Sequence, residues 1–233
     1  MNIYLSENML ASVFWEQLDL TSAQQDAETD ARSIVSFSAL IAERFPNKTG
    51  SISAEGARVL WLLARYFSPR VIVEIGTYIG RSTSSLYLGA KSTLEHLYTC
   101  DATFDAWSSD HLEADGTIEY FGKTTSTQML FELSSRDVKA DLFFIDGRLQ
   151  EEDLELLSAV ATENSVFVLD DFEGLEKGVA NGLLLKKQFS NLITIEPPAR
   201  AHFGKADPHR FGLMFPSSNI LLTAQRTRPH VLD

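Results

Sequence analysis

The sequence contains a single cysteine, Cys100, among 233 residues. One thiol excludes an internal disulfide and a thiolate cage for a metal, so any metal site must use oxygen or imidazole ligands. No segment approaches the roughly 20 consecutive apolar residues of a membrane helix, and no membrane association is expected. The stretch Met1–Leu20 contains Glu7 and Glu16 but neither lysine nor arginine, so no secretory signal is expected and we predict a cytoplasmic protein.

Basic residues are scarce relative to acidic ones. The chain has 20 Lys and Arg against 32 Asp and Glu, a formal net charge of −12. This charge repels phosphate backbones and anionic lipid and favours cations or small neutral partners. Nucleic acid is therefore not expected as a partner. With 44% hydrophobic and 22% charged residues the composition is that of a globular protein, and one α/β domain with extra helices accounts for the length.

The first third of the chain has helical periodicity. One run ends before Pro46, and a second begins at Ser53; their apolar positions are Ile34, Phe37, Leu40, Ile41 and Phe45, and Leu60, Leu62, Leu63 and Tyr66. We predict a helical cap or lid at residues 1–52 and the main domain at residues 53–233. An apolar face near the N-terminus could serve the lid, a dimer interface or the core.

From Arg70 onward short β-rich segments alternate with helical ones. This alternation is typical of a mostly parallel sheet covered on both faces. The predicted strands are Val71–Ile75, His96–Cys100, Ile118–Phe121, Leu142–Ile145 and Val166–Leu169, followed by Leu192–Glu196, Gly212–Phe215 and Ile220–Ala224. The predicted helices are Arg81–Ala90, Phe104–Glu113, Ser126–Ser135, Glu151–Ala161 and Leu175–Phe189. The last two strands predict an antiparallel hairpin that finishes one edge of the sheet.

The residues that follow the first two strands indicate a ligand site, because such sheets bind ligands at the carboxyl ends of their strands. Gly76 allows a sharp turn and Gly80 allows a ligand to approach the next helix. Tyr78 stands where the dinucleotide fingerprint has its middle glycine, so that fingerprint is absent. A tight turn with nothing bound is the alternative. Asp101 can accept hydrogen bonds from a ribose or can cap the helix that follows.

Three carboxylates follow the fourth and fifth strands. Asp146, Asp170 and Asp171 end neighbouring apolar segments and are expected to converge. They would repel one another unless a cation or a proton lies between them. Hard divalent ions such as Mg²⁺ prefer oxygen ligands. The alternative is that Asp146 and Asp171 cap helices while Asp170 is solvated.

These residues carry a family resemblance. Val73–Ser82 resembles the first motif of class I S-adenosylmethionine-dependent methyltransferases, and its Glu-x-Gly-x-Tyr-x-Gly-x-Ser form is similar to the cation-dependent O-methyltransferases of the catechol and caffeoyl-coenzyme A type. Phe144–Gly147 and Leu169–Phe172 also resemble bacterial O-methyltransferases that tailor antibiotics. The resemblance covers roughly residues 53–189. It implies a Rossmann-like, doubly wound, mostly parallel seven-stranded sheet with an antiparallel C-terminal edge, extra N-terminal helices, and a homodimer.

The resemblance also implies roles for individual residues. Glu74, Gly76 and Ser82 would line the methionine part of S-adenosylmethionine, Asp101 would hold its ribose, and Gly122 and Thr125 would lie at its adenine. Thr125 replaces a longer amide of the family. The remaining residues expected around the cofactor are Thr77, Tyr78, Gly80 and Asp146. Asp146, Asp170 and Asp171 fall on the metal ligands.

One position departs from the family pattern. The catechol and caffeoyl types have a catalytic lysine, and a bacterial group a histidine, where this chain has Leu149. Arg148 is adjacent, but a guanidinium stays protonated and is a poor base. The remaining candidates for a proton acceptor are Lys177, His202 and His209. We expect Asp146, Asp171 and Lys177 to take part in catalysis.

The resulting hypothesis is methyl transfer from S-adenosylmethionine to a hydroxyl of a small diol or phenol, assisted by Mg²⁺ or another divalent cation. The alternatives are a metal-independent methyltransferase, including one that acts on nitrogen, a relative that binds the cofactor without catalysis, and a nicotinamide-dependent oxidoreductase.

Overall fold

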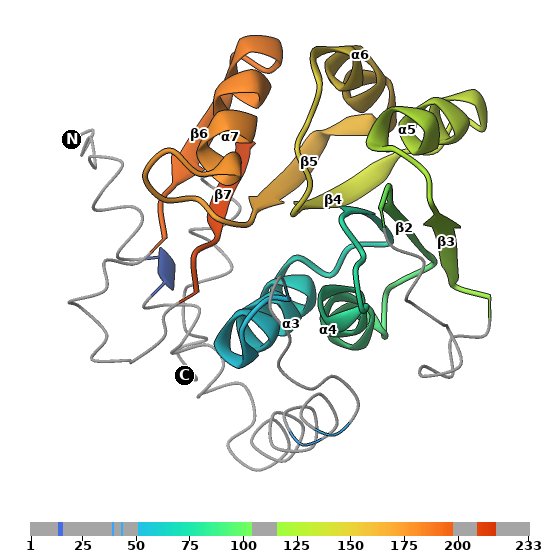
Figure 1. The fold of residues 1–233 in the computed structure, drawn as a ribbon, viewed down its shortest axis with the longest axis vertical. Helices are drawn as coiled ribbons and strands as arrows, with labels where there is room; N and C mark the ends of the chain where they lie inside the picture. Colours follow the sequence, from blue (N-terminus) through green and yellow to red (C-terminus); the bar gives the residue numbers. More distant parts are fainter. Residues whose placement is uncertain are drawn as a thin grey trace, which may run out of the picture.

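The computed structural model describes residues 14–15, 39, 43, 51–103, 116–197 and 209–217. Helices and strands alternate along most of the described chain (Figure 1). Their bounds are α3 Ala54–Phe67, β1 Val71–Ile75, α4 Arg81–Ala90, β2 His96–Asp101, β3 Ile118–Gly122, α5 Ser126–Ser135, β4 Ala140–Ile145, α6 Glu151–Val160, β5 Ala161–Leu169, α7 Lys177–Gln188, β6 Leu192–Ile195 and β7 Gly212–Pro216.

The strands form one seven-stranded sheet in the order β3-β2-β1-β4-β5-β7-β6. Strands β1 to β5 pair in parallel, whereas β7 runs antiparallel to both β5 and β6. The predicted Rossmann-like sheet with an antiparallel C-terminal edge is therefore confirmed. The strand order reverses beside β1, which lies between β2 and β4, and this is where ligands bind in such sheets.

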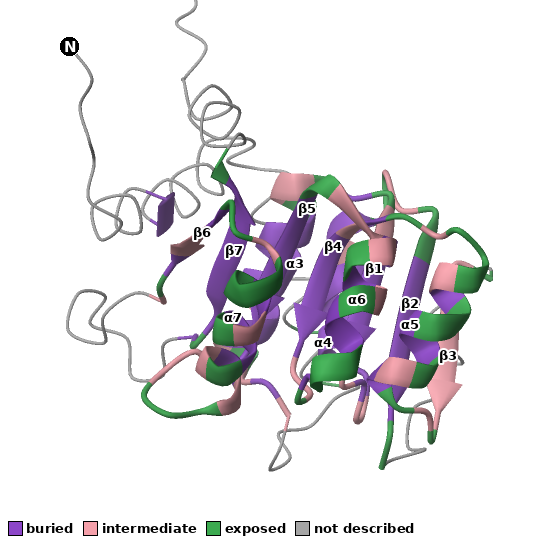
Figure 2. Cartoon of the chain, turned by 90° about the horizontal axis from the view of Figure 1, so that it is seen from above, coloured by how far each residue is buried: buried purple, intermediate pink, exposed green. Residues whose placement is uncertain are grey.

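Helices cover both faces of the sheet. In Figure 1, α3 and α4 lie together on one side and α5, α6 and α7 on the other. Figure 2 shows that the central strands are mostly buried behind the layer of α5, α6 and α7, in which exposed and buried segments alternate. Two clusters of apolar side chains fill the spaces between sheet and helices. A central strand such as β1 is buried along most of its length, because both of its faces are covered.

Local signals in the sequence correctly predict where several helices begin and end. The side chain of Ser53 accepts a hydrogen bond from the backbone nitrogen of Gly56 at 3.0 Å, so α3 begins where its N-cap residue predicts. α4 and α5 have the predicted bounds. β5 begins earlier than predicted, at Ala161, because its first residues are polar and partly exposed and do not carry the apolar pattern of a buried strand.

The predicted C-terminal hairpin needs correction. Gly212–Pro216 pairs with β5 on one side and β6 on the other, so the antiparallel pair at this edge is β6 and β7. The pairing brings together segments that are separated along the chain, and period-two patterning carries no information about such partners.

Three further predictions lie outside the described residues. They are the strand Ile220–Ala224, the helix Phe104–Glu113 and most of the cap at residues 1–52.

Two residues of the N-terminal region pack on the domain. Phe14 and Trp15 are buried, and the indole nitrogen of Trp15 donates a hydrogen bond to the carbonyl oxygen of Glu196 at 2.7 Å. The Trp15 ring lies 4.5 Å from the ring of His209, centroid to centroid.

Among the described residues, no helix is long and apolar enough to cross a membrane.

A matched pair of phenylalanines tests this packing. Phe143 is fully buried and stacks on Phe167 with 4.9 Å between ring centroids, whereas Phe131 is 65% exposed. We expect Phe143→Ala to lower the free energy of unfolding by about 3–5 kcal/mol, because it leaves a cavity. Phe131→Ala should change it by less than about 0.5 kcal/mol. Urea unfolding followed by circular dichroism measures both values, and equal losses would contradict the assigned core.

Candidate functional site

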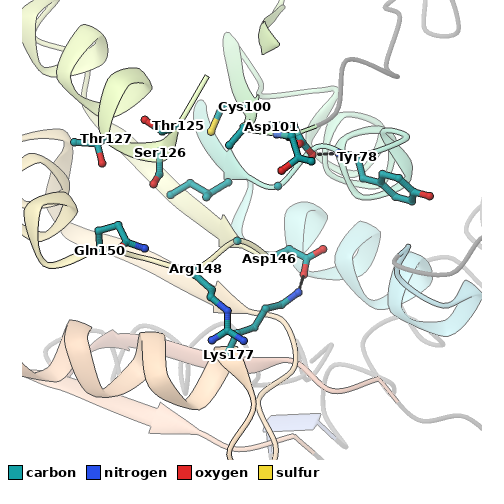
Figure 3. Close-up of a pocket in the computed structure, with 15 residues that line it drawn as sticks. Tyr78, Cys100, Asp101, Thr125, Ser126, Thr127, Asp146, Arg148, Gln150 and Lys177 are labelled. Carbon is teal, nitrogen blue, oxygen red and sulfur yellow. Dashed lines mark hydrogen bonds and ion pairs between the residues drawn. The ribbon is translucent and has the colours of Figure 1, made fainter. Parts of the chain in front are cut away.

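A cleft of about 590 Å³ opens at the carboxyl ends of β1, β2 and β4, beside the point where the strand order reverses. It is lined by the turn after β1, the residues after β2, the first residues of α5, the segment after β4 and the first residue of α7 (Figure 3). The lining residues are Ile75, Gly76, Tyr78, Cys100, Asp101, Ala102, Thr103, Thr125, Ser126, Thr127, Asp146, Gly147, Arg148, Gln150 and Lys177.

The turn after β1 is tied to the neighbouring strands by backbone hydrogen bonds. The nitrogen of Gly76 donates to the carbonyl oxygen of Cys100 at 2.9 Å, and the nitrogen of Asp146 donates to that of Ile75 at 2.9 Å. Gly76 has a φ of 107°, and a Cβ atom there would lie 3.2 Å from the nitrogen of Gly147. Glycine is therefore needed both for the turn and for the close approach of the two loops.

Asp101 faces this turn from the end of β2. Its Oδ2 accepts a hydrogen bond from the backbone nitrogen of Tyr78 at 2.8 Å, and its Oδ1 accepts one from Thr103 at 2.9 Å. Figure 3 shows the first of these bonds at the mouth of the cleft. A carboxylate offers about four acceptor positions, so Asp101 can also accept hydrogen bonds from a ligand with neighbouring hydroxyls.

The side of the cleft formed by α5 and α6 is held by a buried carboxylate. Asp153 is fully buried and accepts hydrogen bonds from the hydroxyls of Ser126 and Thr127 at 2.8 and 2.6 Å and from the backbone nitrogen of Gln150 at 2.9 Å. All three donors line the cleft. The sequence analysis missed this set, because Asp153 reads as an ordinary acidic residue in the first turn of a helix.

The three aspartates do converge. One carboxylate oxygen from each of Asp146, Asp170 and Asp171 lies within 4.8 Å of the others. Helix capping does not explain them, since the N-cap residues of α6 and α7 are Gln150 and Glu176. Asp170 is only 8% exposed, which excludes the solvated alternative. Asp171 has a φ of 51°, a left-handed conformation that aspartate adopts more readily than most residues. We call these three residues the acidic triplet.

Two cationic side chains contact the acidic triplet. The ammonium of Lys177 lies 2.5 Å from Oδ1 of Asp146 and 3.1 Å from Oδ2 of Asp171. Arg210 forms an ion pair with Oδ1 of Asp171. Figure 3 shows Lys177 reaching Asp146 from the opposite wall of the cleft. Lys177 was among the candidate catalytic residues, but Arg210 was missed, because it is distant in sequence from the motif residues.

Burial and mutual repulsion shift the pKa values of the acidic triplet. Burial raises the pKa of Asp146 to about 8, with a further rise from the charge of Asp170 and a partial offset from Lys177. Burial also raises the pKa of Asp170, and the charge of Asp171 adds to it. Burial by itself lowers the pKa of Lys177, but Asp146 and Asp171 raise it by more, so the pKa lies above its ordinary value. Its contacts with two carboxylates thus favour the protonated form of Lys177.

Several predicted site residues are not among those that line the cleft. Glu74, Thr77 and Ser82 are buried and do not line the cleft, and neither do Gly80 and Gly122. Gly76, Tyr78, Asp101, Thr125 and Asp146 do line it. Thr125 is also the N-cap of α5, where it forms a reciprocal pair of hydrogen bonds with Gln128.

The position of the family's base and the other candidates for a proton acceptor lie in different places. Leu149, which stands at that position, is a core residue whose backbone nitrogen donates to Oδ1 of Asn181 at 3.0 Å. His209 packs against Trp15 and Phe211 and does not line the cleft. His202 lies outside the described residues.

Comparison with known proteins gives a family match over part of the chain. A family model described as a methyltransferase domain matches residues 73–172, which include the turn after β1, Asp101 and the acidic triplet. Lys177 and Arg210 lie beyond the matched segment. No curated protein matches the sequence.

Solved structures with a similar fold include O-methyltransferases. TomG from Streptomyces achromogenes, an O-methyltransferase involved in tomaymycin synthesis and solved with S-adenosylmethionine, is 18% identical with a TM-score of 0.51, over 78% of this chain and 89% of TomG. An O-methyltransferase from Bacillus cereus, solved with S-adenosylhomocysteine, is 15% identical with a TM-score of 0.54, over 88% of this chain and 98% of the other. A putative O-methyltransferase from Klebsiella pneumoniae is 15% identical with a TM-score of 0.55, over 89% and 99%.

Glu74 gives the site a testable pH dependence. It is fully buried and accepts hydrogen bonds from Thr83 at 2.5 Å and Thr99 at 2.6 Å. Burial raises its pKa from 4.5 to about 7, and the hydrogen bonds from neighbouring hydroxyls offset this only in part. The pKa of Glu74 is higher in the folded than in the unfolded protein. The contribution of the Glu74 carboxyl to stability is therefore complete below the unfolded-state pKa of 4.5 and is lost as the pH rises through the folded-state pKa of about 7.

We therefore expect the free energy of unfolding of the wild type to fall by roughly 2–3 kcal/mol relative to that of Glu74→Gln as the pH rises from 5 to 8, because glutamine does not titrate. Urea unfolding at several pH values measures the difference. Glu163→Gln at an exposed position serves as the control and should show no such trend. A difference between Glu74→Gln and wild type that stays constant with pH would refute the assigned burial effect.

Proposed function

Starting from the methyltransferase domain at residues 73–172, we propose that the protein is an S-adenosylmethionine-dependent O-methyltransferase that acts on a hydroxyl of a small molecule. The observation that carries the proposal is the shared cleft. The turn after β1 and Asp101 line the same cavity as Asp146, so a methyl donor bound at the first two would lie beside the acidic triplet.

The roles of the cleft residues follow from their positions. Asp101 would accept hydrogen bonds from the ribose hydroxyls, because its carboxylate lies at the end of β2 and lines the cleft. The turn at Gly76 and Tyr78 would receive the methionine part, and Thr125, Ser126 and Thr127 would lie on the adenine side. Asp146 lines the cleft and also belongs to the acidic triplet. It would therefore set the distance between the methyl group and the acceptor oxygen. Such positioning is a large part of catalysis in a transfer between two bound molecules.

The donor set of the acidic triplet suits a hard divalent cation, because its three carboxylates can each give an oxygen and these oxygens lie within 4.8 Å of one another. Asp146, Asp170 and Asp171 would hold the ion. A bound Mg²⁺ would lower the pKa of a coordinated hydroxyl and so replace part of the work of a general base. This would account for a core leucine at position 149.

A metal-independent methyltransferase is the second candidate. It is favoured by the contacts of Lys177 and Arg210, which already provide positive charge at the acidic triplet. Added chelator separates the two candidates. Methyl transfer that falls at least tenfold and returns with Mg²⁺ supports the metal-dependent enzyme, whereas unchanged transfer supports the second candidate.

The homodimer, the cytoplasmic location and the cap at residues 1–52 stay predictions.

Asp101→Asn tests the cofactor site. The amide keeps the shape of the side chain but removes one charged acceptor, so we expect the affinity for S-adenosylhomocysteine to fall at least tenfold, in line with the roughly 1.5–3 kcal/mol of a hydrogen bond to a charged group. Isothermal titration calorimetry measures it. Asp137→Asn, at an exposed turn, is the control and should bind like wild type. Equal affinities of all three proteins would reject the ribose role of Asp101.

A labelled-methyl assay tests the reaction class. Protein incubated with methyl-labelled S-adenosylmethionine and a panel of small diols, phenols and amines should yield products labelled on oxygen, identified by mass spectrometry. Labelling on nitrogen alone would contradict the O-methyltransferase. Titration with a nicotinamide cofactor in parallel should show no binding at micromolar concentration, and tight binding there would instead favour the oxidoreductase alternative.

A further inference from the structure

The position of Lys177 has a consequence for the cation site. We propose that Lys177 is a tethered cation that occupies the place of a divalent ion in the acidic triplet, so that a metal ion binds only by displacing it. This inference rests on the proposed function, in which the acidic triplet is a cation site, and it concerns how that site is controlled.

The ammonium of Lys177 and a metal ion need the same oxygens. The Lys177 nitrogen lies 2.5 Å from Oδ1 of Asp146 and 3.1 Å from Oδ2 of Asp171. The other oxygen of Asp171 is paired with Arg210. A Mg²⁺ ion binds carboxylate oxygens at about 2.0–2.1 Å. An ion held by the same two carboxylates would therefore lie almost on the ammonium, and the two cannot be present together.

The chain also holds Lys177 in this place. Gly178 follows directly, and a Cβ atom there would lie 2.1 Å from the carbonyl oxygen of Asp170. Only glycine lets the start of α7 come so close to the end of β5. Asn181 fixes the same helix to the neighbouring loop, since its Nδ2 donates to the carbonyl oxygen of Gly147 at 2.8 Å. A lysine on a helix start that is fixed in this way competes as an intramolecular ligand at high effective concentration.

The charges at the acidic triplet also favour an exchange. When all three carboxyls are ionised, Lys177 and Arg210 balance two of their three negative charges in a site that is partly removed from water. Adding a divalent ion while both cations remain would give an excess of positive charge at short range, which is unfavourable in a buried site. Release of Lys177 relieves this excess. Because Lys177 already borders the cleft, its displaced side chain has space to move there.

Binding of Mn²⁺ to the full-length protein tests the exchange. We expect Lys177→Met to bind Mn²⁺ at least tenfold more tightly than wild type, measured by electron paramagnetic resonance of the free ion. Lys177→Arg keeps the charge and should stay within about threefold of wild type, as should the control Lys186→Met at an exposed position of α7. Equal dissociation constants for wild type and Lys177→Met would overturn the proposal.

A measurement on the wild-type protein keeps the test independent of how the variant folds. Saturating Mg²⁺ should raise the labelling of Lys177 by an amine-reactive reagent at least threefold, quantified by mass spectrometry, while Lys186 stays unchanged. Labelling of Lys177 that does not respond to Mg²⁺ would overturn the exchange, as would the absence of metal binding at millimolar concentration. Affinity for S-adenosylhomocysteine, measured in the same samples, judges the proposed methyltransferase separately.

Discussion

Mutual repulsion of three carboxylates at one edge of the sheet is the constraint on which the site depends. β4 and β5 are neighbouring parallel strands, so the residues that follow them are brought together, and burial of Asp146 and Asp170 removes the water that would screen their charges. A folded chain can keep such a group only with compensating positive charge or bound protons. Lys177 and Arg210 supply the charge from α7 and from the segment before β7. The arrangement of the C-terminal elements around the end of β5 can be understood from this requirement.

The turn after β1 connects the acidic triplet to the side of the cleft that we propose for the cofactor. Its hydrogen bonds run to β2 on one side and to β4 on the other, so Asp101 and Asp146 are fixed relative to each other through a few backbone contacts. This rigidity suits a reaction in which two bound molecules must meet in line. Asp153 has a similar part on the opposite wall, where one buried carboxylate organises residues of α5 and α6.

The sequence analysis was most accurate where local chemistry decides the structure. Ser53 begins α3, and α4 and α5 have their predicted bounds, since caps and apolar periodicity are local signals. The acidic triplet was also predicted, because aspartates that follow parallel strands must lie at the same edge. The predicted cofactor residues Glu74 and Ser82 are buried and are not among the residues that line the cleft, and their contact with a cofactor stays a prediction.

The sequence by itself determined the class of fold, the edge of the sheet that carries the site and the carboxylates that form it. These follow from strand and helix periodicity and from the direction shared by parallel strands. Only the tertiary structure decided which cations face the acidic triplet, that β7 lies between β5 and β6, and that Asp153 holds one wall of the cleft. These contacts join residues that are distant along the chain, and their free energy depends on distance and burial, which no local pattern encodes.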